Sequence, residues 1–66
     1  MKKNDKVRLL GKPDKEANSP AEMRDFVRHA PTIGIIDHIA DDGMLLVRVE
    51  PLDYFWFTPD AVEVCN

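Results

Sequence analysis

The segment Thr32 to Val49, TIGIIDHIADDGMLLVRV, constrains the fold more than any other stretch of this chain. Two runs rich in β-branched and other apolar residues, Thr32–Ala40 and Met44–Val49, flank the turn sequence Asp41-Asp42-Gly43. The glycine supplies the positive φ that a tight hairpin turn needs, so the two runs are predicted to pair as antiparallel strands. Gly34 inside the first run indicates a bulge or a close backbone approach.

The alternation of apolar and polar residues predicts three more strands. They are Lys6–Leu10, Tyr54–Thr58 and Val62–Cys65, the last following a turn at Thr58–Ala61 that fits one 3₁₀ turn. A break is expected at Glu50–Asp53, because its proline cannot donate to a strand ladder. The residues expected to share one core are Val7, Leu9, Val47, Val49, Phe55, Phe57, Val62 and Val64.

One short helix is predicted between the first and second strands. Ser19 is a helix cap, Pro20 stands where its missing N–H costs nothing, and Glu22 can close a capping box. Pro31 ends the helix near residue 30. A helix this short is not stable alone and has to pack on the sheet. The apolar stripe expected to make that contact is Met23, Phe26, Val27 and Ala30.

Three segments together resemble SH3-like barrels: the opening NDKVRLL, the hairpin IGIIDHIADDGMLLVRV and the ending FWFTPDAVEV. The chain is similar in this respect to the barrels of the mind-bomb type and to the photosystem I accessory subunit PsaE. The resemblance implies a mainly β fold: a small five-stranded SH3-like barrel, with residues 1–66 as one domain. The helix inserted after the first strand, Ser19–Ala30, departs from the standard layout. Signalling SH3 domains bind Pro-rich peptides, but the ALYDY-type opening that they share is absent here.

The charge balance disfavours nucleic acid as the partner. Twelve acidic residues stand against nine basic ones, for a net charge of −3, whereas nucleic-acid binders gain affinity by neutralising phosphates. A basic N-terminal arm keeps a nucleic-acid-associated barrel as the alternative function; its residues are Lys2, Lys3, Lys6, Arg8, Lys12 and Lys15.

The same totals bear on location. A single cysteine cannot form an intramolecular disulfide bond, and the absence of such bonds favours a reducing, cytoplasmic setting. The N-terminus lacks the apolar run of a signal peptide, and no segment approaches the ~20 apolar residues that a membrane span needs. No membrane association is expected.

The histidines and the cysteine are the candidates for catalytic or metal-binding chemistry. His29 and His38 could join Asp37, Asp41 or Cys65, but no metal-ligand spacing is present. His29 is instead expected to interact with the helix C-terminal dipole, and His38 to lie on a strand surface. Cys65 has no neighbouring base, and the Asp41-Asp42 pair reads as turn residues. The sequence therefore predicts no enzyme, no cofactor and no metal site.

The aromatic run Tyr54–Phe57 holds the candidate binding site. Period-2 alternation directs Tyr54 and Trp56 to the face opposite the predicted core. Two alternatives are open: the favoured one places them under the Met23/Phe26/Val27 helix, and the other leaves them exposed to a partner. With Pro59 nearby and acidic Asp53, Asp60 and Glu63 flanking them, a basic or Pro-rich partner is expected. The predicted function is an interaction module or accessory subunit that binds a protein or peptide, as a monomer or a homodimer.

Overall fold

Five strands, one α-helix and one 3₁₀ turn make up residues 1–50 and 53–65, which the computed structural model describes. The predicted break at Glu50–Asp53 includes Pro51 and Leu52, which lie outside these residues. In chain order the elements are β1 (Lys6–Leu9), α1 (Pro20–His29), β2 (Ile33–Ile39), β3 (Leu45–Val49), β4 (Asp53–Phe57), η1 (Pro59–Ala61) and β5 (Val62–Val64). The mainly β fold with a helix after the first strand is confirmed.

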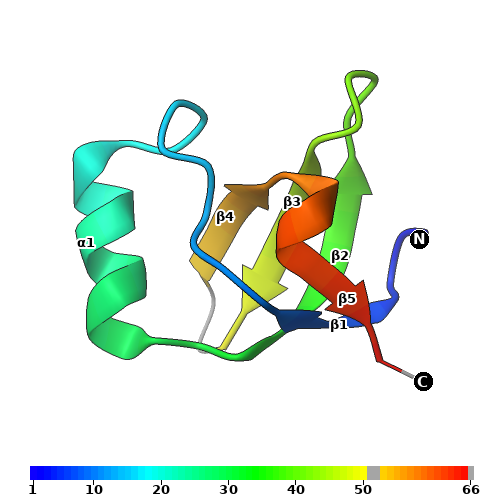
Figure 1. Cartoon of the computed structure of the whole chain (residues 1–66), viewed down its shortest axis with the longest axis horizontal. Coiled ribbons are helices and arrows are strands. Elements are labelled where there is room, and N and C mark those ends of the chain that lie inside the picture. Colours follow the sequence, from blue (N-terminus) through cyan, green and yellow to red (C-terminus); the bar gives the residue numbers. More distant parts are fainter. Residues whose placement is uncertain (51–52, 66) are drawn as a thin grey trace.

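All strand pairs of the sheet are antiparallel, in the order β4-β3-β2-β1-β5. Figure 1 shows α1 beside the sheet, at the end where β4 lies. Strands β4 and β5 are the two edges, and within the described residues no pairing joins them, so the sheet does not close on itself. Each edge strand therefore needs another means of satisfying its outward backbone groups.

The β2–β3 hairpin forms as its turn sequence predicts. Gly43 has φ +91°, and the Asp42 carboxylate accepts a hydrogen bond from the Met44 N–H at 3.0 Å. Gly34 marks a close approach, because a Cβ there would collide with the Val47 side chain. The bulge lies further along β2, where the register with β3 shifts between Ile36 and His38. The first of the two explanations for Gly34 is therefore wrong and the second is confirmed.

One face of the sheet supplies nearly all of the core. The buried apolar side chains are Val7, Phe26, Ile36, Leu45, Val47, Val49, Phe55, Phe57 and Val62. The predicted core is confirmed except at Leu9 and Val64, which are only partly buried and pack against the margin of this cluster. Both phenylalanines of β4 stand opposite buried residues of β3, because the strands pair Leu45 with Phe57 and Val47 with Phe55.

Helix α1 begins and ends as the sequence indicates. The Ser19 hydroxyl accepts from the Glu22 N–H at 3.1 Å, and the Glu22 carboxylate accepts from the Ser19 N–H at 2.8 Å, which completes the capping box. At the other end Ala30 adopts the left-handed conformation, φ 44°, and its N–H donates to the Phe26 carbonyl. The helix has ten residues, and no helix among the described residues has both the length and the apolar character to cross a membrane.

The helix covers the opposite face of the sheet from the one expected. The Phe26 ring meets Phe55 and Phe57 edge-on, with ring centroids 5.3 and 5.7 Å apart. The favoured expectation that α1 packs over Tyr54 and Trp56 is therefore wrong. Phenylalanine has no polar group, whereas Tyr and Trp each have one that can bond to water. Packing α1 over Phe55 and Phe57 is therefore more favourable than packing it over Tyr54 and Trp56.

The apolar stripe of α1 is also narrower than predicted. Phe26 is buried and Met23 half-buried, but Val27 is 55% exposed and Ala30 is exposed. One large ring thus makes the central contact between α1 and the sheet. The expectation that Val27 joins this contact is wrong, because a contact centred on Phe26 turns the neighbouring position towards solvent.

Candidate functional site

The outer edge of β4 is occupied by the loop that precedes α1. The Asn18 side chain is 5% exposed, the most buried polar residue of the described chain. Its Nδ2 donates to the Trp56 carbonyl at 2.9 Å, and its Oδ1 accepts from the Trp56 N–H at 3.0 Å. The Asp14 N–H donates to the same carbonyl at 2.9 Å. Asn18 therefore takes the place of a neighbouring strand at this point and fixes the position of Trp56.

The polar composition of Gly11–Asn18, with its glycine and proline, predicts an ordinary loop and gives no indication of this contact. An asparagine before a helix cap is a common loop residue, and nothing in its local pattern distinguishes one that reaches a strand 38 positions away. The sequence carries only an indirect indication that β4 is contacted in this way. An edge strand as apolar as β4 requires partners for its outward N–H and C=O groups, and a buried Asn can satisfy both.

The aromatic face is the surface of β2, β3 and β4 that lies opposite α1. Tyr54 and Trp56 lie on it, with Tyr54 42% exposed and Trp56 half-buried. The His38 ring meets the Trp56 ring edge-on, with centroids 6.5 Å apart. By the register of the sheet, this face consists of Ile35, His38, Leu46, Arg48, Tyr54 and Trp56.

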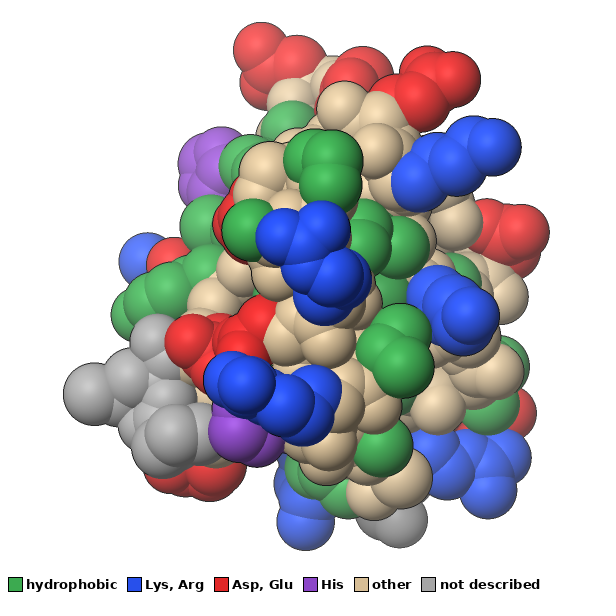
Figure 2. Space-filling model, turned by 90° about the vertical axis from the view of Figure 1, so that its left-hand side faces the viewer, with side chains coloured by type: hydrophobic (Ala, Val, Ile, Leu, Met, Phe, Trp, Pro, Cys, Tyr) green, Lys and Arg blue, Asp and Glu red, His purple; other side chains and the backbone are tan. Residues whose placement is uncertain are grey.

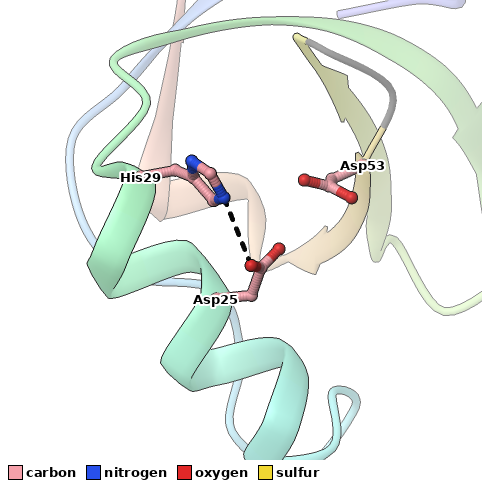
Figure 3. Close-up of side chains that lie close together, drawn as sticks. All are labelled: Asp25, His29 and Asp53. Atoms are coloured by element: carbon pink, nitrogen blue, oxygen red, sulfur yellow. Dashed lines mark ion pairs between the residues drawn. The ribbon is translucent and has the colours of Figure 1, made fainter.

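The other predicted site residues do not join the aromatic face. Asp53 alternates with Tyr54 and lies on the α1 side of the sheet, near Asp25 (Figure 3). Pro59 and Asp60 are exposed in η1, beyond the opposite end of β4. Glu63 forms an ion pair with Arg8 at 2.9 Å on the distant strands β5 and β1.

The five candidates thus occupy three places rather than one surface. Tyr54 and Trp56 share a face, Asp53 alternates to the α1 side and meets only Tyr54, at the open edge of β4, and the η1 pair is at the far end of β4. Of the acidic residues that favoured a basic partner, Asp53 therefore lies near Tyr54, whereas Asp60 and Glu63 lie away from both aromatic side chains.

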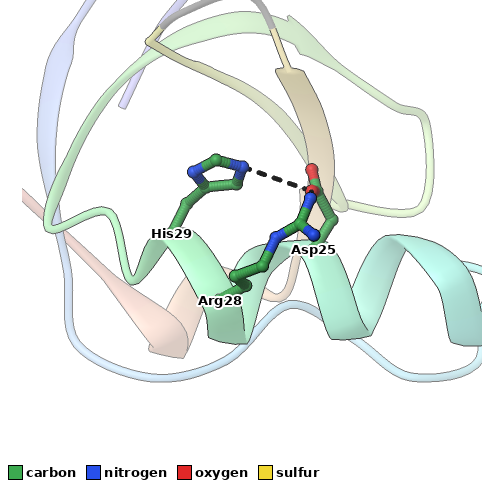
Figure 4. Close-up of polar contacts among 3 residues, drawn as sticks. All are labelled: Asp25, Arg28 and His29. Atoms are coloured by element: carbon green, nitrogen blue, oxygen red, sulfur yellow. Dashed lines mark hydrogen bonds and ion pairs between the residues drawn. The ribbon is translucent and has the colours of Figure 1, made fainter.

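An acidic hollow of about 500 Å³ separates α1 from the start of β4. Its lining includes three carboxylates, together with aromatic and small side chains; the residues are Ala21, Glu22, Asp25, Asp53, Tyr54 and Phe55. Asp25 is half-buried and lies between two cationic or ionisable neighbours on its own helix (Figure 4). Its Oδ1 is 3.2 Å from the Arg28 guanidinium and 3.3 Å from the His29 Nε2.

The solvent side of α1 has the opposite charge. Figure 2 looks onto this side and shows Lys and Arg side chains among exposed hydrophobic ones. A second hollow of about 380 Å³ lies there, lined by Lys12, Met23, Arg24, Val27 and Arg28. Helix α1 therefore presents a basic, partly apolar side to solvent and an acidic side to the start of β4.

The remaining reactive side chains have ordinary surroundings. Cys65 is a free, half-buried thiol, and His38 is an exposed strand residue, as the sequence predicts. His29 is in the last turn of α1, again as predicted, but its closest charged neighbour is Asp25.

Comparison of the chain with protein-family models, with curated proteins and with solved structures gives no match.

Proposed function

We propose that this chain is a non-enzymatic interaction module that binds a protein or peptide partner through the aromatic face. The observation that carries the proposal is the placement of α1. The helix covers the Phe55/Phe57 face, so Tyr54 and Trp56 remain on a surface that α1 does not cover. Tyr and Trp are the residue types most enriched at the energetic centres of protein interfaces, since they bury large area at little entropic cost.

The aromatic face has neighbours suited to such a contact. Leu46 lies directly across from Trp56, and the next row across the strands is Tyr54, Arg48 and Ile35, so apolar side chains of three strands surround one exposed arginine. Asn18 holds the Trp56 backbone from the edge, which limits the rearrangement that binding would require. A rigid apolar centre with a polar margin is the usual arrangement of a protein interface.

The charge on this face favours an apolar segment flanked by acidic residues as the ligand. Arg48 pairs across the strands with Tyr54 and is exposed, so a cation lies directly beside the ring. A basic ligand would meet this cation, whereas an acidic residue next to an apolar anchor would pair with it. The basic or Pro-rich ligand expected from the sequence is replaced in this proposal, because Asp53 and Glu63 are directed elsewhere.

We also propose an SH3-like barrel as the architecture of the module. Support comes from the strand order β4-β3-β2-β1-β5 and from the 3₁₀ turn η1 between the aromatic strand and the last strand. Strongly bent small barrels leave their outer face to solvent, which is consistent with the exposure of Tyr54. An SH3-like fold alone does not define a function, so the proposal of binding depends on the aromatic face.

Selection of ligands from a random peptide display library tests the proposal. Trp56 is the single tryptophan of the sequence, so its fluorescence reports directly on occupancy of the aromatic face. Selected peptides are expected to shift its emission saturably and to perturb the backbone amide resonances of β3 and β4. Tyr54→Ala is expected to weaken binding by about tenfold or more, the range of an interface hot spot.

Val27→Ala is the matched control, since Val27 is a similarly exposed apolar residue on the other side of the molecule. It should leave peptide affinity unchanged. Peptides whose resonance shifts map to α1, or an equal loss of affinity in both variants, would contradict the proposal. A library that yields no saturable ligand would also count against peptide binding by this face.

A nucleic-acid-associated role is the second candidate, because one observation favours it. Lys6 pairs with Ile35 across β1 and β2, which places this lysine on the same side of the sheet as Tyr54 and Trp56. Aromatic side chains combined with cations can bind single strands by stacking and phosphate contacts. A titration of single-stranded oligonucleotides, followed by Trp56 fluorescence, separates the two candidates. Nucleic-acid binding must weaken steeply with added salt, whereas binding of an apolar peptide should change little.

A further inference from the structure

Three side chains with metal-binding atoms converge at the mouth of the acidic hollow. Asp25 and His29 are one helical turn apart on α1, and Asp53 is the first residue of β4. One donor atom from each side chain lies within 4.8 Å of the other two. Figure 3 shows the three side chains directed toward the same space. This set differs from the combinations of histidines with Asp37, Asp41 or Cys65 that the sequence suggested.

The spacing between the two helical donors fits direct coordination of a metal ion. The Asp25 Oδ1 and the His29 Nε2 are 3.3 Å apart. Two ligands of a tetrahedral zinc ion, each bonded at about 2.05 Å, are separated by about 3.3 Å. Residues four apart on a helix share one face, so the helix itself sets this spacing. The Asp53 carboxylate lies within 4.8 Å of the other two donor atoms, and a side-chain rotation has to bring it to coordination distance of the same ion.

The charges at the site also favour a cation. Asp25, Asp53 and Glu22 place three carboxylates around one hollow. Within the described residues Asp53 takes part in no ion pair, and Arg28 is the cation nearest to Asp25. The Arg28 side chain is 77% exposed, so it can swing into solvent when another cation arrives. A divalent ion would relieve the repulsion between Asp25 and Asp53.

We propose that Asp25, His29 and Asp53 bind one transition-metal ion of the zinc class. The imidazole selects such an ion over Mg²⁺ and Ca²⁺, which prefer oxygen ligands alone. Water completes the coordination, because His29 is exposed and Asp25 and Asp53 are only half-buried. The ion joins the last turns of α1 to the start of β4, two elements held together in the core by Phe26. Metal binding therefore stabilises the folded state.

Titration of the full chain with Zn²⁺ against a chromogenic chelator tests the proposal, together with the visible spectrum of the Co²⁺ form. One equivalent of Zn²⁺ is expected to bind saturably and to raise the melting temperature, and Mg²⁺ should not compete. His29→Ala and Asp53→Asn are each expected to weaken binding by at least about tenfold, as the removal of one ligand implies. Both positions are outside the core, and circular dichroism verifies that the variants fold.

Two variants serve as controls for adventitious binding. His38→Ala removes the other histidine, on the aromatic face, and Cys65→Ser removes the thiol. Neither should change zinc affinity. Equal affinity in His29→Ala and the native chain, or no saturable binding at millimolar Zn²⁺, would overturn the proposal. In that case the Asp25–His29 contact is an ordinary helix ion pair.

Arg28→Ala sharpens the test by predicting a gain. The Arg28 guanidinium contacts the Asp25 oxygen that would coordinate the metal, at 3.2 Å (Figure 4). Removing this competitor should tighten zinc binding by several-fold, whereas a surface ion pair without metal would give no such gain. Unchanged or weaker affinity in Arg28→Ala would show that Asp25 is not a ligand. Neither result depends on whether the aromatic face binds a peptide.

Discussion

Replacing Asn18 with alanine should destabilise the protein more than any other substitution in the loop between β1 and α1. The change removes three side-chain hydrogen bonds: two to the backbone of Trp56 and one, at 2.7 Å, to the Asp14 carbonyl. The three lost hydrogen bonds differ in whether the backbone group keeps another partner. The Trp56 carbonyl keeps the Asp14 N–H as a donor, and the Asp14 carbonyl keeps the Asn18 N–H. The Trp56 N–H loses the one partner that the loop provides.

The magnitude follows from this difference. An unsatisfied N–H costs about 1–3 kcal/mol, and each of the two other bonds contributes about 0.5–1.5 kcal/mol net. We therefore expect the free energy of unfolding to fall by about 2–6 kcal/mol. With a urea slope of about 1 kcal/mol per molar for a small domain, the unfolding midpoint should drop by about 2 M or more. For a chain of 66 residues that is a large share of total stability.

Urea denaturation followed by Trp56 fluorescence and far-UV circular dichroism measures the effect. Asn18→Leu tests the cause, because leucine retains the volume of the side chain but not its hydrogen bonds. If packing were responsible, Leu would restore the midpoint; if hydrogen bonding is responsible, it should not. Glu16→Ala, an exposed change in the same loop, should stay within about 0.5 kcal/mol of the native chain. A midpoint for Asn18→Ala within 0.5 M of native, or rescue by Leu, would refute the reasoning.

Three further substitutions test the fold, each measured by the same denaturation. Gly34→Ala should cost about 1–3 kcal/mol, because the new Cβ collides with Val47; a neutral result would mean that the sheet can separate locally. Ala30→Gly should stabilise by about 0.5–1 kcal/mol, since glycine adopts the left-handed cap, φ 44°, without strain; a loss of stability would contradict this account of the helix end. Phe26→Ala should cost about 3–5 kcal/mol while Val27→Ala costs less than about 0.5, and similar losses in both would restore the wider apolar stripe.

Features that depend on residues close along the chain could be predicted from the sequence. The capping box of Ser19 and Glu22, the turn at Gly43 and the alternation in Tyr54–Phe57 each follow from local backbone geometry. The residues of each such feature lie within a few positions of one another, so the feature can be recognised without knowing which distant segments pack together. The elements, most of the core and the division of the four aromatic residues between two faces could therefore be predicted.

The face of the sheet that the helix covers could not be predicted from any local pattern. Alternation places Phe55 and Phe57 on one side and Tyr54 and Trp56 on the other, but both sides offer large apolar surfaces to a helix. The choice depends on the combined packing of Phe26 with residues from distant strands.

The same limit applies to the contacts of Asn18 and Asp53. Asn18 reaches Trp56, and Asp53 reaches Asp25 and His29, across long separations in the chain. Nothing in the local pattern of either residue encodes its partner, because the partner is set by how α1 docks on the sheet. The period of a strand fixes which side chains share a face, and only packing fixes what meets them.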